Sequence, residues 1–331
     1  MNEITSRDNQ WVKLACSLKQ KKGRQAHQRV FVEGLRVIAD AAAMAIPDAI
    51  CFVSEKGRAL DGFEALYARG LELGWTFYAV TDSVYDKLKD TRTPQGLAAM
   101  LPFFAYTFDS LPAIAPEKAV LYLRSIQDPG NLGTILRTAA AANAGAVLLS
   151  EGSVDVYNDK TIRSAMGAIF KVPVVQDVTD EQLDQFCADE DRQVYGTAPE
   201  GTVSYVDADY SQPVILAFGN EGNGLPGPFL DCCDDVLTIP MRPDTDSLNL
   251  SMSVGIVLYK AALDLGFAKL DLQRQQRCGF PEVVYCAGKT VNQSVRILDI
   301  LMEKYDNVIG TRADKAVYDA LAGRHPAAQY D

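Results

Sequence analysis

The chain has 331 residues but only two histidines, His27 and His325. Histidine is a frequent ligand of catalytic zinc and the usual base of a serine-hydrolase triad, so its scarcity argues against both kinds of site. The seven cysteines are scattered and form no Cys-x-x-Cys pair, which argues against a structural zinc site and a dithiol redox centre. We expect reduced cysteines, several of them in hydrophobic cores, and no metal.

Targeting and membrane-spanning segments are also absent from the sequence. The first eight residues are polar and mixed in charge, unlike the basic-then-apolar layout of a signal peptide. The longest apolar run, around 139–149, is interrupted by Asn143 and Gly145 and is too short to cross a bilayer. These absences predict a cytoplasmic protein without membrane contact.

The charge is distributed unevenly along the chain. The net charge is −11, yet the first 36 residues carry eight Lys or Arg against three Asp or Glu. This asymmetry predicts a basic arm on an acidic body, and a local excess of positive charge is what phosphate contacts require. A solvated, lysine-rich helix end remains the alternative. The candidate nucleic-acid contacts are Lys13, Lys19, Lys21, Lys22, Arg24 and Arg29.

Hydrophobic patterning divides the chain into four regions. Residues 1–105 are expected to form a small α/β domain, with helices at 35–44 and 62–73. Residues 106–117 contain Pro112 and Pro116 and are predicted to be a linker, and 266–331 read as a polar tail. In the first domain, the predicted strands are 28–34, 50–53, 75–80 and 96–101.

Residues 118–265 are expected to form a second α/β domain. Its apolar strands alternate with helical segments, which predicts a mainly parallel sheet with helices on both faces. A last helix is expected at about 250–265. The predicted strands are 119–123, 146–150, 172–175, 193–196, 214–218 and 235–239.

Three segments of the second domain each follow a predicted strand and suit ligand binding. The first, DPGNLGTILRT at 128–138, places Asn131 and Arg137 six residues apart, so they converge only if Asn131 lies in the loop before the helix. The second, FGNEGNGLP at 218–226, lets backbone approach a ligand closely, and its Glu221 suits a cationic sulfonium better than a pyrophosphate. The third, IPMRPDTDSLNLS at 239–251, leads into a helix that Ser247 is expected to cap. Taken singly, the first segment fits an Asn turn with a surface Arg as well as a site, the second can be a flexible turn, and the third favours a helix cap.

Together, the order and spacing of these segments resemble motifs 1, 2 and 3 of the SpoU (TrmH-like) RNA ribose methyltransferases of the SPOUT class. The resemblance covers 118–265 and includes RSAMGA at 163–168. The first domain resembles that family's ribosomal-protein-like α/β RNA-binding domain, on the strength of FVEG at 31–34 and TPQG at 93–96. The resemblance implies a trefoil-knot fold, a homodimer whose active site is completed near the subunit interface, and S-adenosylmethionine as cofactor.

The resemblance also implies roles for individual residues. Gly219, Ile239 and Leu248 match cofactor-contacting positions, and Gly222 and Met241 lie beside them in the same segments. The polar active-site positions are matched by Asn131, Arg137, Glu221, Ser247 and Asn249. The implied reaction is methyl transfer to a ribose 2′-hydroxyl. Arg137 would act as the base or, because a guanidinium stays protonated, as an anchor for the nucleotide phosphate.

Three alternative functions are weighed against RNA ribose methylation. A Rossmann-type dehydrogenase would need a G-x-G-x-x-G sequence, which is absent. A non-catalytic RNA-binding or ribosome-assembly factor and a tRNA methyltransferase remain open, although the separate first domain favours ribosomal RNA.

Residues 277–312 resemble the N-terminal segment of nickel-pincer-nucleotide carboxylase-like proteins, without their catalytic core. This predicts a small appended βα element without chemistry of its own, in either a natural fusion or a truncated chain.

Overall fold

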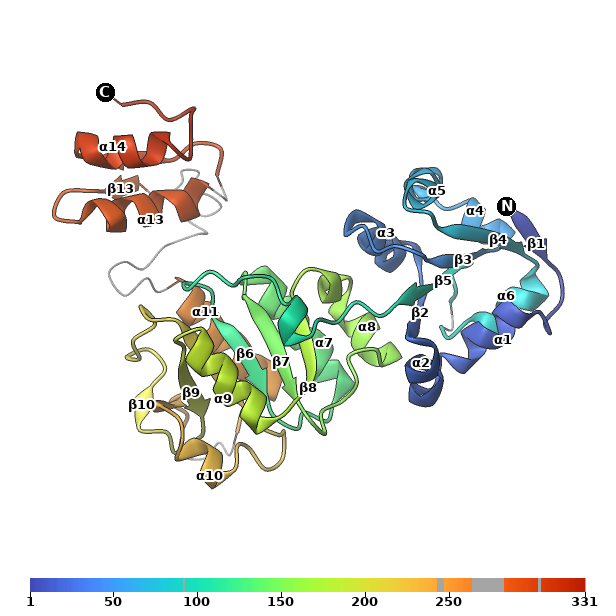
Figure 1. The fold of residues 1–331 in the computed structure, drawn as a ribbon, viewed down its shortest axis with the longest axis horizontal. Coiled ribbons are helices and arrows are strands. Elements are labelled where there is room, and N and C mark those ends of the chain that lie inside the picture. The colour runs from blue at the N-terminus through green and yellow to red at the C-terminus, as the bar shows by residue number, and fades with distance from the viewer. Residues whose placement is uncertain (92, 243–246, 264–282, 303–304, 331) are drawn as a thin grey trace. The chain divides into compact units, whose positions relative to one another are not determined.

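The computed structural model describes residues 1–331 apart from 92, 243–246, 264–282, 303–304 and 331 (Figure 1). The described residues divide into two compact units. The larger unit comprises residues 1–208 and 212–259, and the smaller comprises 209–211 and 260–331. Hydrophobic clusters fill both units.

The first sheet of the larger unit has five strands among the described residues, in the order β1-β4-β3-β5-β2. Strand β5 runs antiparallel to β2 and β3, whereas β1 and β3 run parallel to β4. The strands are β1 (Asn2–Ile4), β2 (Arg29–Glu33), β3 (Ile50–Val53), β4 (Thr76–Val80) and β5 (Leu97–Pro102). The helices are α1 (Gln10–Ser17), α2 (Lys21–His27), α3 (Leu35–Ala43), α4 (Glu55–Arg58), α5 (Phe63–Glu72) and α6 (Asp82–Leu88).

Local sequence explains where these elements begin. All four residues of β3 are buried, as expected for an apolar run in the interior of a sheet. Thr81 caps α6 by accepting a hydrogen bond from the backbone N–H of Val84. Gly34 precedes α3 with a φ of +110°, a conformation that favours glycine. The strands and helices predicted for this domain are confirmed to within a residue.

The basic N-terminal segment is folded rather than extended. Residues 10–27 form α1 and α2, and Val12, Ala15 and Leu18 are buried in the same cluster as Phe31 of β2. The expected arm is therefore wrong, because the apolar face of α1 packs into the domain core. The first strand, β1, was not predicted; it is only three residues long and pairs with the edge of β4.

The second sheet of the larger unit has seven strands within the described ranges, in the order β10-β12-β9-β11-β6-β7-β8. Every paired neighbour is parallel, as predicted. The strands are β6 (Val120–Leu123), β7 (Ala146–Ser150), β8 (Val174–Val178), β9 (Gln193–Thr197), β10 (Val203–Ser204), β11 (Val214–Phe218) and β12 (Asp235–Thr238). The helices are α7 (Pro129–Ala141), α8 (Asp159–Ala165), α9 (Asp180–Asp189), α10 (Gly227–Leu230) and α11 (Leu250–Leu263).

Both faces of this sheet are covered. Val120 and Tyr122 of β6 share a cluster with Phe186 of α9, and the alternating residues Leu121 and Leu123 are fully buried on the other face. The expected helices on both faces are confirmed. None of the helices described in the structure is long and apolar enough to span a membrane.

The predicted linker, 106–117, packs against the second sheet. The backbone N–H of Tyr106 donates to the carbonyl of Val174 at 2.8 Å. Phe108, Leu111 and Ile114 then join the cluster beneath α9. The segment is therefore an ordered strap, because its apolar side chains gain burial on the sheet.

An ion pair and a tyrosine join the first sheet's domain to the second. Arg24 of α2 contacts the carboxylate of Asp155 at 2.7 Å, and the two side chains are only 7% and 12% exposed. The hydroxyl of Tyr157 accepts hydrogen bonds from the backbone N–H groups of Phe104 (2.8 Å) and Ala105 (2.7 Å). These contacts fix the chain that leaves β5 against the loop before α8.

The smaller unit is a βαβα element and not simply a polar tail. Strands β13 (Val283–Tyr285) and β14 (Ile309–Thr311) pair in parallel, and α13 (Val291–Met302) and α14 (Lys315–Ala322) pack on them. Buried apolar side chains, including Val284, Leu301 and Leu321, form its core. The predicted appended βα element is confirmed, whereas residues 277–282 of the tail resemblance lie outside the described residues.

The Tyr157 hydroxyl provides a test of the domain junction. Tyr157→Phe keeps the ring stacked on Phe103 but leaves two backbone N–H groups without their acceptor. We expect a loss of about 1–3 kcal/mol in the free energy of unfolding, measured by urea denaturation. Tyr106→Phe is the matched control, because the Tyr106 side chain has no hydrogen bond among the described residues. Equal effects of the two substitutions would contradict this account of the junction.

Candidate functional site

The three segments predicted to carry chemistry meet at one edge of the parallel sheet. They follow β6, β11 and β12, whose carboxyl ends lie along the same edge. In open parallel sheets, ligands bind in the crevice outside these ends. Strands β6 and β11 are direct neighbours, and only β9 separates β11 from β12.

Glu221, in the loop after β11, connects two of these segments. One carboxylate oxygen accepts hydrogen bonds from the backbone N–H of Asp128 (3.0 Å) and the side-chain amide of Asn131 (3.2 Å). The other oxygen accepts from the backbone N–H of Gln127 at 3.0 Å. The loop after β11 is thereby tied to the turn that opens α7.

The same contacts determine the charge state of Glu221. Burial alone would raise the pKa of this carboxyl, but the N–H groups of Asp128 and Gln127 and the amide of Asn131 stabilise the ionised form. The net effect lowers the pKa of Glu221 below its ordinary value of 4.5. A carboxylate is therefore present at this edge at neutral pH.

Asn131 and Asn249 join the third segment to the same network. The side-chain amide of Asn249 donates to the side-chain oxygen of Asn131 at 3.1 Å. Asn131 lies inside α7, which begins at Pro129, so the condition for Asn131 and Arg137 to converge is not met; the first turn of the helix itself reaches the edge.

Asn249 and not Ser247 caps α11. The helix begins at Leu250, and the Asn249 side-chain oxygen accepts from the N–H of Ser251 at 3.0 Å. The predicted helix start at about residue 250 is therefore confirmed, and Ser247 lies three residues before it. Residues 243–246 of the third segment lie outside the described residues.

The glycine-rich loop is a closed turn. The backbones of Asn220 and Gly224 exchange two hydrogen bonds, at 3.1 and 2.9 Å, and the Asn220 side-chain oxygen accepts from the N–H of Gly222 and Asn223. Its side-chain amide donates to the carbonyl of Ser125, next to β6, at 2.8 Å. A merely flexible turn does not describe this loop, because both ends and its interior are hydrogen-bonded.

Gly219 is required by packing at the start of this turn. A Cβ atom at position 219 would lie 2.0 Å from the carbonyl carbon of Gly224 and 2.2 Å from the N atom of Leu225. Both neighbours are backbone atoms and cannot move like the end of a side chain. The strand end at 219 can therefore pass the closed turn only as glycine.

A cavity of ≈ 480 Å³ opens beside this turn. Its volume lies within the range of small-molecule sites. Backbone of the glycine-rich loop forms one side, and the chain between β12 and α11 forms another. All five residues predicted to contact the cofactor line it, and two of the predicted polar residues join them: Gly219, Gly222, Ile239, Met241, Leu248, Glu221 and Ser247.

The lining of this cavity fits S-adenosylmethionine. Glycine backbone allows close approach to a nucleoside, Ile239 and Leu248 offer apolar cover, and Glu221 is an anion suited to a sulfonium. Sequence reasoning missed the chain after β9, where Thr197, Pro199 and Glu200 also line the cavity. Only the strand order, with β9 between β11 and β12, reveals them.

Arg137 is not part of this cavity. Its side chain is exposed on α7 and has no hydrogen bond or ion pair with any residue that the structure describes. Asn131 and Asn249 also lie outside the lining; Asn131 is hydrogen-bonded to Glu221, and Asn249 lies between the lining residues Leu248 and Leu250. One chain therefore brings seven of the eight residues predicted in the second and third segments to the cavity, all but Asn249, and leaves Arg137 of the first segment apart.

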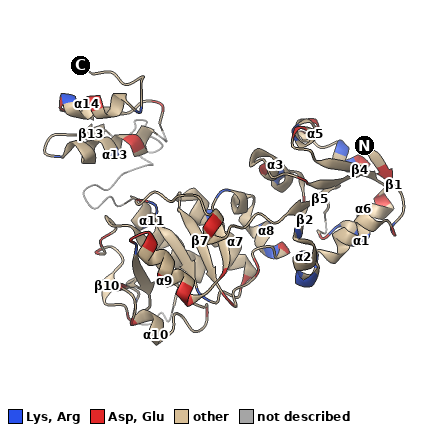
Figure 2. Ribbon diagram, in the orientation of Figure 1, with Lys and Arg blue, Asp and Glu red and all other residues tan. Residues whose placement is uncertain are grey.

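The six candidate RNA contacts differ in availability, and Figure 2 shows the Lys and Arg positions of α2 in blue. Lys21 and Lys22 are exposed on α2 and have no ion pair within the described residues. Arg24 is buried by Asp155 and is left out of the proposed RNA-contacting set. The remaining three pair with carboxylates: Lys13 with Asp8, Lys19 with Asp90 and Arg29 with Asp48.

Comparison with protein families agrees with this geometry. Residues 118–259 match the model of the SpoU rRNA Methylase family, and residues 9–99 match the MRM3-like substrate binding domain. Residues 262–331 match the LarB/PurE-like N-terminal domain, which confirms the resemblance predicted for the tail.

Relatives cover most of the chain. The 23S rRNA (guanosine(2553)-2'-O)-methyltransferase RlmP of Bacillus subtilis is 33% identical over 261 residues, which span 78% of this chain and 98% of that protein. The chain belongs to the SpoU family. A 23S rRNA (uridine(2479)-2'-O)-methyltransferase of Streptomyces viridochromogenes is 31% identical over 173 residues, or 51% of this chain and 60% of its own length.

A solved SpoU-like structure supports the fold. The AdoMet-bound rRNA methyltransferase of Sinorhizobium meliloti aligns with a TM-score of 0.71 and 29% identity, covering 78% of this chain and 97% of that one. The predicted SPOUT methyltransferase fold with a preceding substrate-binding domain is confirmed. The trefoil knot itself stays a prediction.

Gly219→Ala tests the closed turn. Because its Cβ would overlap backbone, we expect a cost of about 1–3 kcal/mol in unfolding free energy. We also expect adenosylmethionine affinity to fall by more than about tenfold, since the cavity wall must shift. Gly227→Ala is the control, because no atom lies within 4 Å of its added Cβ. Calorimetric titration of both variants checks this, and an unchanged affinity in Gly219→Ala would contradict it.

The lowered pKa of Glu221 predicts a pH-dependent contribution to stability. A carboxyl with a depressed folded-state pKa stabilises the fold above its unfolded pKa and loses that contribution as pH falls through the folded value. The stability advantage of the wild type over Glu221→Gln should therefore be constant near neutral pH and vanish below pH 4.5. Urea denaturation across pH measures this difference, and an advantage that grows on acidification would contradict it.

Proposed function

We propose that this chain transfers a methyl group from S-adenosylmethionine to a ribose 2′-hydroxyl of ribosomal RNA. The observation that carries the proposal is the cavity beside the closed glycine turn, which all five expected cofactor positions line. The kinship with RlmP, a protein named as a 23S rRNA 2'-O-methyltransferase, favours ribosomal RNA over tRNA. The first domain's match to a substrate binding domain agrees with an RNA substrate.

In this proposal, S-adenosylmethionine supplies the activated methyl group when bound. Gly219 and Gly222 would let the backbone contact the nucleoside of the cofactor. The apolar side chains of Ile239, Met241 and Leu248 would cover the nucleoside and exclude water from it. Glu221 has two roles. It is part of the cavity lining, and its carboxylate accepts the hydrogen bonds that hold the turn before α7.

Arg137 is assigned to the RNA and not to the cofactor. Its guanidinium stays protonated, so it suits an anionic phosphate better than the role of base. The proton of the 2′-hydroxyl would then leave to solvent or to the neighbouring phosphate. Asn131, one and a half turns before Arg137 on α7, holds that helix to the active edge through Glu221 and Asn249.

The position of Arg137 supports a homodimer. Helix α11 is apolar on nearly every side, and Met252 and Tyr259 are 60% and 41% exposed on its surface. Such a helix is expected to be covered by another chain. A second copy on this face would bring its own Arg137 toward the cavity, so the interface would complete the site. The trefoil knot belongs to the same proposal.

The function and the role of Arg137 are tested together. Wild-type protein, labelled adenosylmethionine and unmodified ribosomal RNA should give a product that resists alkaline cleavage at one ribose. Arg137→Ala should reduce methyl transfer by at least about a hundredfold, the scale of a lost transition-state contact, with adenosylmethionine affinity unchanged. Arg137→Lys, which keeps the charge, should recover RNA affinity in part.

The outcomes separate the alternatives. Product on tRNA alone would reassign the substrate. Adenosylmethionine binding without transfer to ribosomal RNA, tRNA or ribosomal subunits would favour a non-catalytic RNA-binding factor. Wild-type turnover by Arg137→Ala would exclude any role for this side chain in the reaction.

A further inference from the structure

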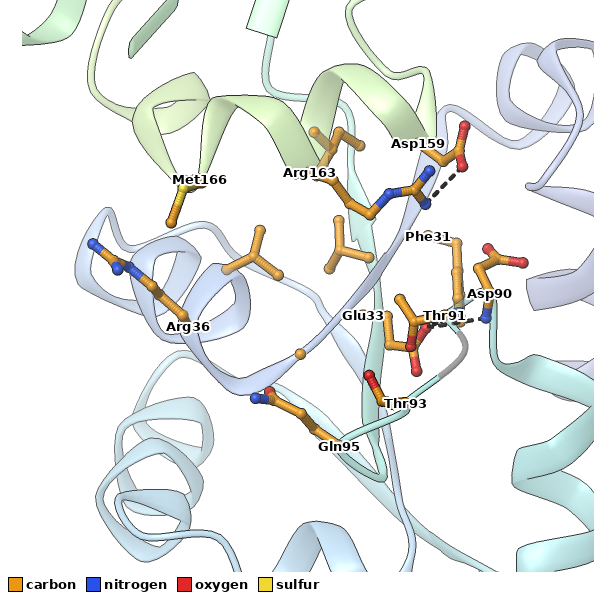
Figure 3. Close-up of a pocket in the computed structure, with 14 residues that line it drawn as sticks. Phe31, Glu33, Arg36, Asp90, Thr91, Thr93, Gln95, Asp159, Arg163 and Met166 are labelled. Atoms are coloured by element: carbon orange, nitrogen blue, oxygen red, sulfur yellow. Dashed lines mark hydrogen bonds and ion pairs between the residues drawn. The ribbon is translucent and has the colours of Figure 1, made fainter. Parts of the chain in front are cut away.

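A second cavity, of ≈ 340 Å³, lies away from the cofactor site, where the first domain meets α8 (Figure 3). Its walls come from the end of β2 with the start of α3, from Asp90, Thr91, Thr93 and Gln95, and from α8 with the following Met166. These are the three segments outside the motifs on which the family resemblance rested: 31–34, 93–96 and 163–168. The function proposed above assigns no role to them.

The floor of this cavity is held in place by two side chains. The carboxylate of Glu33 accepts hydrogen bonds from the backbone N–H groups of Asp90 (3.0 Å) and Thr91 (3.1 Å). The side-chain oxygen of Gln95 accepts from the N–H of Leu35, at the start of α3, at 2.8 Å. The cavity is therefore formed before any ligand arrives, which lowers the entropic cost of binding.

The lining combines polar groups on one side with apolar groups on the other. The Gln95 amide nitrogen and the hydroxyls of Thr91 and Thr93 have no hydrogen-bond partner in the part of the chain that is described. Figure 3 shows Thr91, Thr93 and Gln95 on the opposite side of the cavity from Arg163 and Met166. Met166 is 46% exposed, although it is a large apolar side chain.

Charge at the rim is also available. Arg36, on the first turn of α3, is exposed and has no ion pair among the described residues, whereas Arg163 pairs with Asp159 at 2.7 Å. The carboxylate of Glu33 is fully occupied by its three donors, the two N–H groups and the hydroxyl of Tyr85. Among the described residues that line this cavity, Arg36 is thus the cation most available to an anion.

We propose that this cavity binds one unpaired nucleotide of the RNA substrate. Single-stranded RNA is recognised by splaying out a base, covering its face with apolar or planar side chains and hydrogen-bonding its edge. Met166 would cover the base, Gln95, Thr91 and Thr93 would read its edge, and Arg36 would meet the backbone phosphate. A base-paired helix could not place a base in a cavity of this size. The inference rests on the proposed RNA methyltransferase function.

The cavity is mechanically linked to the active edge. Helix α8, which Met166 follows directly, packs closely on α7, which carries Asn131 and Arg137. At Gly133 of α7 an added Cβ would lie 2.6 Å from the carbonyl oxygen of Thr161 on α8. Two helices in such close contact move as one body, so a nucleotide bound here would set the register of the target ribose at the other site.

The test uses full-length protein and unmodified ribosomal RNA. Gln95→Glu keeps an oxygen to accept from Leu35 but replaces the amide donor by a negative charge, so RNA affinity should fall about tenfold or more. Arg36→Ala should reduce the slope of log affinity against log salt by about one. Arg58→Ala, an exposed arginine of the same domain that does not line the cavity, should change the affinity far less. Adenosylmethionine affinity should be unchanged in all three.

Ultraviolet cross-linking to ribosomal RNA provides a readout that does not depend on variants. A nucleotide attached to the peptide carrying Met166 or to the 90–95 loop supports the proposal. Cross-links confined to α1 and α2, with wild-type affinity in Gln95→Glu, would overturn it while leaving methyl transfer intact. Absence of methyl transfer by the wild type would instead overturn the proposed function. Micromolar binding of free AMP, GMP, CMP or UMP, abolished in Gln95→Glu while RNA affinity is unchanged, would assign the cavity to a free nucleotide and reject the RNA proposal.

Discussion

The carboxylate of Glu221 is the constraint on which the candidate active site depends. Two donors from the turn before α7 and the Asn131 amide from the first turn of that helix converge on it, and Asn131 extends the connection to the cap of α11. Sheet topology alone brings three loops to one edge, but it does not fix their conformations. A charged acceptor does, because hydrogen bonds to an ionised group are about twice as strong as neutral ones. The cavity wall and the helix that carries Arg137 are therefore positioned by one side chain.

Close backbone packing supports this polar network. Gly219 passes the closed turn where no Cβ fits, and Gly133 lets α7 approach α8 at backbone distance. At both glycines the neighbouring atoms are in direct contact with backbone, and such a contact is more rigid than one between side chains that can rotate. Helix α7 is bonded to Glu221 of the cofactor cavity, and α8, which packs on α7, lines the second cavity, so a small displacement of α7 would be felt at both.

Sequence patterns predicted the strands well, because apolar runs bounded by turn residues report burial directly. They also selected the residues of the cofactor cavity through the family resemblance. They failed where the answer depends on spatial neighbours. The chain of Thr197 and Glu200 lines the cavity only because β9 lies between β11 and β12. Arg24 has the pattern of a surface cation, yet Asp155, distant in sequence, buries it. Asn249 caps α11 in the place of Ser247, which was expected to do so. Several polar residues stand side by side before this helix, and the sequence does not tell which of them is the cap.

The charge of the protein bears on how it recognises RNA. The chain carries −11 overall, and of the six cations expected to contact phosphate only Lys21 and Lys22 are free of carboxylates within the described residues. Each neutralised phosphate contributes to affinity through counterion release, so few free cations mean little nonspecific attraction. Specific binding must then come from base and shape contacts. A preformed cavity with unsatisfied donors and an exposed apolar wall supplies such contacts, which makes the acidic composition compatible with an RNA enzyme.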